Sequence, residues 1–140
     1  MADKPILEVK VELDREHIAE FSGPLGQVKM LPFTGTVTGE IFSGTVLPGG
    51  VDTQVTDQNR VRRMSARYML EGKDREGTPC HIYVENEGWF TNGEHPRPFR
   101  TVPTFRTDSA ALAPYLHRSC FRGEGHTQNG QLTIKFFEIQ

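Results

Sequence analysis

The chain lacks any long hydrophobic run. Its apolar stretches are only a few residues long, whereas a transmembrane helix needs about 20 consecutive apolar residues. The first residues, MADKPILEVKVEL, alternate between polar and apolar and form no apolar block, so we also expect no signal peptide. Together these absences predict a cytoplasmic protein.

The chain also lacks an excess of charge of one sign. The formal net charge is -2, and 24% of the residues are charged. This balance gives no electrostatic reason to bind nucleic acid or an anionic membrane. We therefore expect a small organic molecule, and other copies of the chain in a homo-oligomer, as the partners.

Motifs for metals, nucleophiles and phosphate groups are absent. The five histidines and the two cysteines, Cys80 and Cys120, show neither His-x-His nor Cys-x-x-Cys spacing, which predicts no metal site. There is no Gly-x-Ser-x-Gly elbow, and Gly49-Gly50 is not followed by the Lys-Ser/Thr pair of a phosphate loop. We accordingly expect no cofactor. Two cysteines suit a reducing compartment, and a disulfide between them stays open as an alternative.

No segment has a helical period over more than about two turns. The chain instead shows short extended segments between turns, and Gly35, Gly39 and Gly44 recur inside one of them. This pattern predicts an all-β protein in which residues 1–140 form one antiparallel β-barrel, lipocalin-like in general form. Strand glycines favour a closed barrel, because they mark the bends at which a sheet coils. The clearest expected strands are Leu7–Leu13, Gln27–Val37 with an interruption at Pro32, and Arg62–Leu70.

The stretch from Cys80 to Thr107 concentrates groups that could form a site. It reads as a strand that Gly88 ends, a loop with a turn at Asn92-Gly93, and an extended segment from Phe99 to Val102. It contains the only Trp of the chain. The last two expected strands, Ser119–Arg122 and Gln131–Ile139, are joined by a glycine-rich turn from Gly123 to Gly130.

Carboxylates and guanidiniums near the glycine turns are the remaining candidates for chemistry. An Asp that follows Gly-Gly, as Asp52 does, often bonds only to its own turn. An Arg on a strand, such as Arg67, is often a solvated cross-strand partner. If the same groups face a barrel lumen, they orient a polar ligand, and a carboxylate with a shifted pKa acts as a general base.

Five short motifs give the chain a resemblance to a known family. The motifs are Val46–Asp52 (VLPGGVD), Ala66–Tyr68 (ARY), Ile82–Gly88 (IYVENEG), Phe99–Phe105 (FRTVPTF) and Phe121–Gly125 (FRGEG). In this order and spacing the chain resembles domain-of-unknown-function family 3237, also called uncharacterised protein family 0311, from about Gly23 to the C-terminus. The sequence departs from the family pattern at Thr53, at His117 and in a short Gly88–Phe99 loop.

The resemblance implies a single-domain antiparallel barrel and, for most members, no assigned activity. Some relatives are associated with natural-product biosynthesis, including ring closure by addition of a hydroxyl across a double bond. We therefore expect a barrel that binds a small organic molecule in its lumen and acts as a cofactor-free lyase, isomerase or cyclase. A non-catalytic carrier barrel and a structural subunit with a packed lumen stay open as alternatives.

The candidate residues follow from this reading. Asp52 is the expected acid-base carboxylate, with Arg67 as the catalytic charge stabiliser. The expected substrate-binding residues are Tyr83, Asn86, Arg100, Phe105 and Arg118. On a half-buried strand the apolar face usually points inward. Placing Arg67 in the lumen inverts this rule, because the apolar face of the same strand consists of Met64, Ala66, Tyr68 and Leu70. The ordinary alternation makes Tyr68 the inward residue instead.

Overall fold

The structure is a computed structural model that describes residues 4–91, 95–96 and 98–139. Ten strands form one sheet, with a short 3-10 helix η1 (Arg15–His17) and one helical turn α1 (Ala113–Leu116). No helix in these ranges is long and apolar enough to cross a membrane. The strands are β1 (Leu7–Leu13), β2 (Ala19–Gly23), β3 (Gly26–Thr38), β4 (Phe42–Val46), β5 (Val51–Asp57), β6 (Arg62–Asp74), β7 (Pro79–Phe90), β8 (Phe99–Thr107), β9 (Phe121–Gln128) and β10 (Gln131–Glu138).

The sheet closes on itself through β1. This strand pairs antiparallel with β10 on one side and with β3 on the other. The circuit continues through β9, β8, β7 and β6, and returns to β3 through β4 at one level and β5 at the other. The predicted closed antiparallel barrel is therefore confirmed, with eight strands around at either level.

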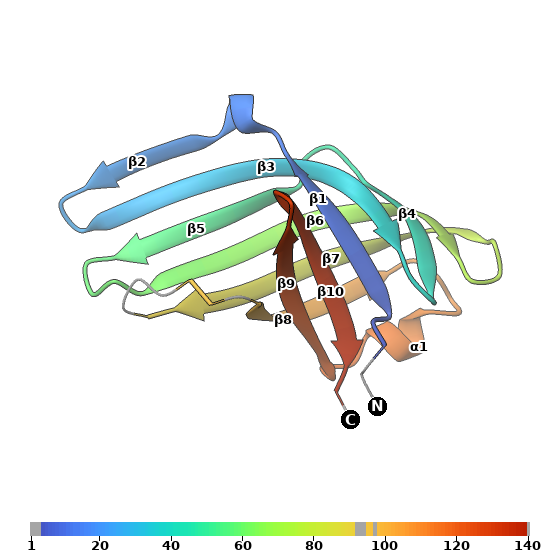
Figure 1. Cartoon of the computed structure of the whole chain (residues 1–140). Helices are drawn as coiled ribbons and strands as arrows, with labels where there is room; N and C mark the ends of the chain where they lie inside the picture. The colour runs from blue at the N-terminus through green and yellow to red at the C-terminus, as the bar shows by residue number, and fades with distance from the viewer. Residues whose placement is uncertain (1–3, 92–94, 97, 140) are drawn as a thin grey trace.

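The two ends of the barrel differ. The ribbon in Figure 1 shows β2, β5 and the neighbouring parts of β3, β6 and β7 extending beyond the crossing strands β1, β9 and β10. All five residues of β2 are exposed. This extension forms a curved sheet at one mouth, whereas α1 lies at the opposite end (Figure 1).

The core fills the end of the barrel near α1. Large side chains with almost no exposed surface come from β1, β4, β6, β7 and β10, among them Leu7, Phe42, Leu70, Ile82 and Phe136. Their burial removes apolar surface from water at about 25 cal/mol per Å². The packed end fixes the frame, and the other half of the lumen is left for a cavity.

The sequence predicted an interruption of the strand at Pro32, and this prediction was wrong. β3 runs through this residue, paired to β5 at Val51. The carbonyl of Pro32 accepts the backbone N–H of Asp14, and the N–H and C=O of a strand residue point to the same side. The missing N–H thus faces the connection between β1 and β2, where no ladder bond is lost.

Two predicted boundaries were wrong. Gly88 does not end its strand, since β7 continues to Phe90. The segment from Gly123 to Gly130 is mostly strand β9, and only its end forms the turn to β10. In both places glycine serves close packing instead of a turn. The predicted turn at Asn92-Gly93 lies outside the described residues.

Candidate functional site

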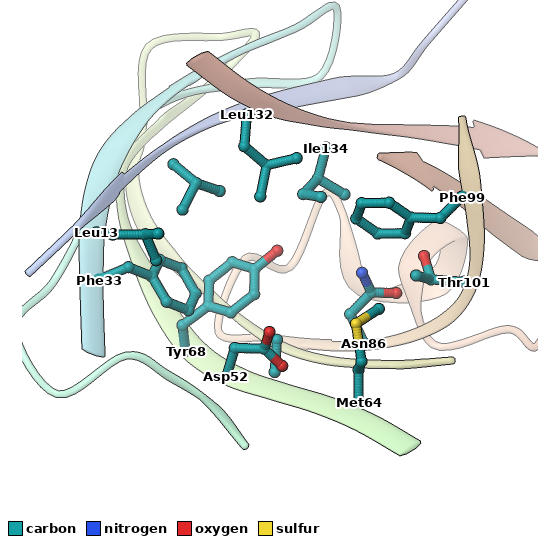
Figure 2. Close-up of a pocket in the computed structure, with 12 residues that line it drawn as sticks. Leu13, Phe33, Asp52, Met64, Tyr68, Asn86, Phe99, Thr101, Leu132 and Ile134 are labelled. Carbon is teal, nitrogen blue, oxygen red and sulfur yellow. The ribbon is translucent and has the colours of Figure 1, made fainter. Parts of the chain in front are cut away.

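A cavity lies in the lumen on the side away from the packed core. Figure 2 shows its lining residues pointing inward from several strands around the barrel. Its volume, measured as the space open to the centre of a water molecule, is about 60 Å³. It is lined by Val11, Leu13, Phe33, Asp52, Met64, Ala66, Tyr68, Asn86, Phe99, Thr101, Leu132 and Ile134.

The size of the cavity limits what it can hold. One water needs roughly 10–15 Å³ by this measure, so the space exceeds a single solvent site. It is smaller than the roughly 300 Å³ of a pocket that encloses a drug-sized ligand. The lumen therefore suits one ring or a short chain, and a larger molecule would have to extend through the mouth.

Asp52 is the carboxylate in this apolar wall. It lies on β5, opposite Ala66 of β6. The side-chain amide of Gln54 donates to its Oδ2 at 2.9 Å, while its Oδ1 is buried and has no hydrogen-bond partner among the described residues. Burial raises the pKa of Asp52 above its usual range, although the Gln54 hydrogen bond and the charge of Arg62 act in the opposite direction.

Three further polar atoms meet the same cavity without a partner in the described part of the chain. They are the Tyr68 hydroxyl, Asn86 Oδ1 and Thr101 Oγ1, and all three are buried. Figure 2 shows the Tyr68 ring reaching into the cavity beside Phe33, with its hydroxyl toward the centre; the two rings meet edge to face at 5.1 Å. Burial and the nearby Asp52 raise the pKa of Tyr68, so its hydroxyl keeps its proton.

Glycines on β9 make room for two of the lining residues. A Cβ added at Gly125 would lie 2.0 Å from the ring of Phe99, and one added at Gly123 would lie 2.2 Å from Thr101 Oγ1. Real Cβ atoms do not approach so closely. These glycines therefore allow the side chains of Phe99 and Thr101 to stand inside the lumen.

The structure brings Asp52 and Asn86 together on the cavity, as expected from the sequence. They lie in one cross-strand row, because Ala66 of β6 pairs with Asp52 on one side and with Asn86 on the other. Residues that pair across strands share a face of the sheet. The common row is the reason that both side chains point into the lumen.

Arg67 is not in the lumen, and this prediction was wrong. It is exposed on the outer face of β6, while its neighbour Tyr68 lines the cavity. The ordinary alternation of a half-buried strand holds here. The apolar set of this strand faces inward, and no local inversion takes place.

The other four predicted ligand-binding residues do not line the cavity either. Tyr83 lies half-buried on β7 and its hydroxyl donates to Glu85 at 2.9 Å. Arg100 is exposed on β8, and Arg118 is exposed over the Tyr115 ring near Glu138. Phe105 is buried, but it packs against the rings of Phe121 and Phe136 in the core.

Ten of the twelve lining residues were not predicted as site residues from the sequence, among them Tyr68, Thr101, Phe33 and Phe99. For Tyr68 a signal was available, since the alternation from Arg62 to Leu70 places it inward. Thr101 follows Arg100, and only the observed register, with Asn86 opposite Pro103, shows which of the two faces the lumen. Strands β1 and β10 also contribute lining residues, such as Leu13 and Leu132. These residues reach the cavity only because the barrel closes, so no local sequence pattern predicts their place in it.

Groups of three or more histidine, cysteine, aspartate or glutamate residues that could hold a metal ion are not found among the described residues. The polar groups that gather in the cavity are one carboxylate, one phenol, one amide and one hydroxyl in an apolar wall. Such a set can orient a ligand by hydrogen bonds and can move one proton.

Known proteins similar to this chain share its barrel. A crystal structure of a protein of unknown function from Clostridium acetobutylicum has a TM-score of 0.77 and 26% identity, over 100% of this chain and 97% of that one. One from Rhodopseudomonas palustris has a TM-score of 0.73 and 25% identity, over 99% and 97%. A β-barrel-like protein from Acinetobacter baumannii, at 18% identity over 99% and 96% of the chains, has a TM-score of 0.76 and shows the fold alone.

Sequence comparison gives the family. The chain is 31% identical over 119 residues to the UPF0311 protein CA_C3321 of Clostridium acetobutylicum, which covers 74% of this chain and 73% of that protein. The model of the family described as "Protein of unknown function (DUF3237)" matches residues 2–139. With nearly the whole sequence matched and the barrel shared, the chain belongs to the DUF3237 family.

Proposed function

We propose that the lumen is a binding site for a small organic molecule and that Asp52 exchanges a proton with it. The observation that supports this is the set of four buried polar atoms without partners on one apolar cavity: Asp52 Oδ1, the Tyr68 hydroxyl, Asn86 Oδ1 and Thr101 Oγ1. A buried polar group without a partner lowers stability by about 1–3 kcal/mol. A ligand with a hydroxyl and a second oxygen would supply the missing hydrogen bonds, because Asn86 Oδ1 and the ionised Asp52 only accept, whereas the Tyr68 and Thr101 hydroxyls can donate.

The chemistry assigned to the site is acid-base catalysis without a cofactor. The Asp52 carboxylate accepts a proton from a carbon or hydroxyl of the substrate, and its raised pKa brings it closer to the range in which a general base works. The Tyr68 hydroxyl donates a hydrogen bond to the substrate oxygen on which negative charge develops. Asn86 and Thr101 orient the substrate. This step is common to lyases, isomerases and cyclases.

The alternative function is a non-catalytic carrier. It is favoured by the apolar wall, in which eight of the twelve lining residues are Val, Leu, Ile, Phe, Met or Ala. A carrier needs the same cavity and the same hydrogen bonds to its ligand. A carrier does not require Asp52 to gain or lose a proton.

A proton-exchange experiment distinguishes the two functions. The protein is incubated with 4-phenylbutan-2-one in deuterium oxide, and deuterium at the carbons beside the carbonyl is followed by NMR. Binding is measured in parallel from the methyl resonance of Met64, which lines the cavity. We expect accelerated exchange that Asp52→Asn lowers by about 100-fold or more, while Glu12→Gln, on an exposed residue of β1, leaves it unchanged. Binding without exchange would favour the carrier, and the absence of binding would contradict the proposal.

A further inference from the structure

A second cavity adjoins the lumen site at the open mouth of the barrel. Its volume, by the same measure, is about 290 Å³. Among the described residues, its lining combines cationic and amide side chains with no carboxylate: Gln27, Lys29, Gln54, Thr56, Arg60, Arg62 and His95. We refer to these seven residues as the rim cavity.

The strand register places the rim cavity on the same inner face as Asp52. Lys29 pairs with Gln54, and Gln54 pairs with Met64, in the cross-strand row next to that of Asp52. Arg62 lies one row further toward the mouth, opposite Thr56. Successive rows on one face are about 6.8 Å apart. The path from the lumen site to Arg62 is thus two rows long.

Gln54 forms the wall between the two cavities. Its side-chain nitrogen lies 2.9 Å from Asp52 Oδ2 and 3.8 Å from the sulfur of Met64, both of which belong to lumen-lining residues. The same side chain lines the rim cavity. A ligand that passes the Gln54 side chain therefore leaves the apolar lumen and meets the cationic groups.

The Arg62 side chain packs on an aromatic ring and has a hydrogen-bonding group to offer a ligand. Its guanidinium lies 5.0 Å from the centre of the Phe90 ring, which fixes it over an apolar surface. Its Nε is buried, with no hydrogen-bond partner in the part of the chain that the structure describes. Lys29, another cation of the rim cavity, forms an ion pair with Glu20 at 3.8 Å.

We propose that the rim cavity binds a carboxylate group, so that the ligand of the barrel is a small organic acid. Its apolar part and the oxygen that Tyr68 binds lie in the lumen, and its carboxylate lies at the rim beside Arg62 and Lys29. This inference rests on the proposed function, because it assigns the second half of the same ligand. Guanidinium is suited to the role, since its planar N–H groups match the two oxygens of a carboxylate. The small size of the lumen is consistent with a ligand that extends into the mouth.

The test compares an acid with its neutral amide. The probes are 3-phenylpropanoate and 3-phenylpropanamide, which share the same ring and chain. Binding is followed at low salt by the methyl resonances of methionine, in which Met64 reports on the lumen and the exposed Met30 and Met69 serve as internal controls. The acid should bind about tenfold more tightly or better, the difference that a hydrogen bond to a charged group provides.

Two variants assign the effect to the rim. Arg62→Gln should remove the preference for the acid and leave the affinity for the amide unchanged. Arg63→Gln is the matched control, because it removes the same charge from the exposed outer face of the same strand. Unchanged dispersion of the NMR spectrum confirms that each variant is folded.

The outcomes separate the two proposals. Equal affinities for acid and amide, with Met64 shifted by both, would overturn the carboxylate subsite and leave the lumen site intact. A preference for the acid that persists in Arg62→Gln, or that Arg63→Gln removes equally, would also overturn the subsite. If neither probe nor 4-phenylbutan-2-one shifts Met64, the lumen site itself is refuted.

Discussion

At the scale of single residues, the surroundings of Asp52 are unfavourable for its charged form. Its pKa is raised by burial, so the folded state takes up a proton more readily than the unfolded state does. The free energy of unfolding then falls as the pH rises from the usual Asp value of about 3.9 through the folded pKa. Above the folded pKa, the charged form of Asp52 lowers the free energy of unfolding.

Asp52→Asn should therefore stabilise the protein at pH 7, by an amount on the order of 1 kcal/mol. The gain should shrink as the pH approaches 3, because there the carboxyl is protonated in both states. Denaturant unfolding at the two pH values measures the difference. Glu12→Gln, on an exposed residue, should show no such pattern, and an equal gain at both pH values would contradict the account.

Tyr68 permits a second test, with Tyr115 as its matched control. The Tyr68 hydroxyl is buried without a partner in the described residues, whereas the Tyr115 hydroxyl donates to Glu138 at 2.8 Å. Tyr68→Phe should leave the free energy of unfolding unchanged or raise it by up to about 1 kcal/mol, and Tyr115→Phe should lower it by about 1 kcal/mol. A larger loss for Tyr68→Phe would show that its hydroxyl has a structural partner.

At the scale of elements, His81 joins three parts of the barrel. Its ring lies 2.8 Å from Asp108, which follows β8, and 3.1 Å from Glu71 on β6. The hydrogen bonds to Asp108 and then to Glu71 raise the pKa of His81. Its interactions stabilise the fold fully below the ordinary His value of about 6.5 and are lost as the pH rises through the folded pKa.

An NMR titration of His81 should give a pKa above 6.5, and Asp108→Asn should lower it more than Glu71→Gln does, because Asp108 is the stronger influence. The site is exposed, so 1 M salt should reduce the shift. A pKa at or below 6.5 in the unchanged protein would show that the three elements are not joined in this way.

The glycines of β4 and β6 show how closely two strands approach where the barrel bends. Gly44 pairs with Gly72, and a Cβ on Gly72 would lie 1.9 Å from the carbonyl oxygen of Ser43. Gly72→Ala should lower the free energy of unfolding by about 3 kcal/mol, at the upper end for an overpacked core. Gly23→Ala, where the nearest atom is 3.9 Å away, should change it by less than about 1 kcal/mol. Thermal unfolding of both variants provides the measurement, and similar losses would contradict this reading.

Strand patterns in the sequence predicted the barrel well. Leu7 to Leu13 alternates and forms β1 with those bounds, and Gly35 and Gly44 lie where strand glycines were taken to mark a coiled sheet. Glycine has two uses in a sheet, however. Gly123 and Gly125 were read as a turn, and they instead make space for Thr101 and Phe99, which only the tertiary contacts reveal.

At the scale of the whole molecule, the residues that line the lumen were predicted less well from the sequence than the barrel itself. Asp52 and Asn86 were placed in a common site from the sequence, and they do face one cavity. Arg67 was not found there because the motif that suggested it carried no information on direction, while the alternation around Tyr68 did. The walls contributed by β1 and β10 exist only after closure of the barrel, so no local pattern could predict them.

The four unpartnered polar atoms of the lumen are proposed to bind a ligand. The most direct measurement is a crystal structure of the protein soaked with 3-phenylpropanoate and with 4-phenylbutan-2-one. For 4-phenylbutan-2-one we expect an ordered molecule in the cavity with its carbonyl oxygen about 2.6–3.2 Å from the Tyr68 hydroxyl. For 3-phenylpropanoate we expect the ring in the lumen and the carboxylate beside Arg62. A lumen that holds only water molecules bonded to these groups after both soaks, or that is closed by side chains, would contradict the account.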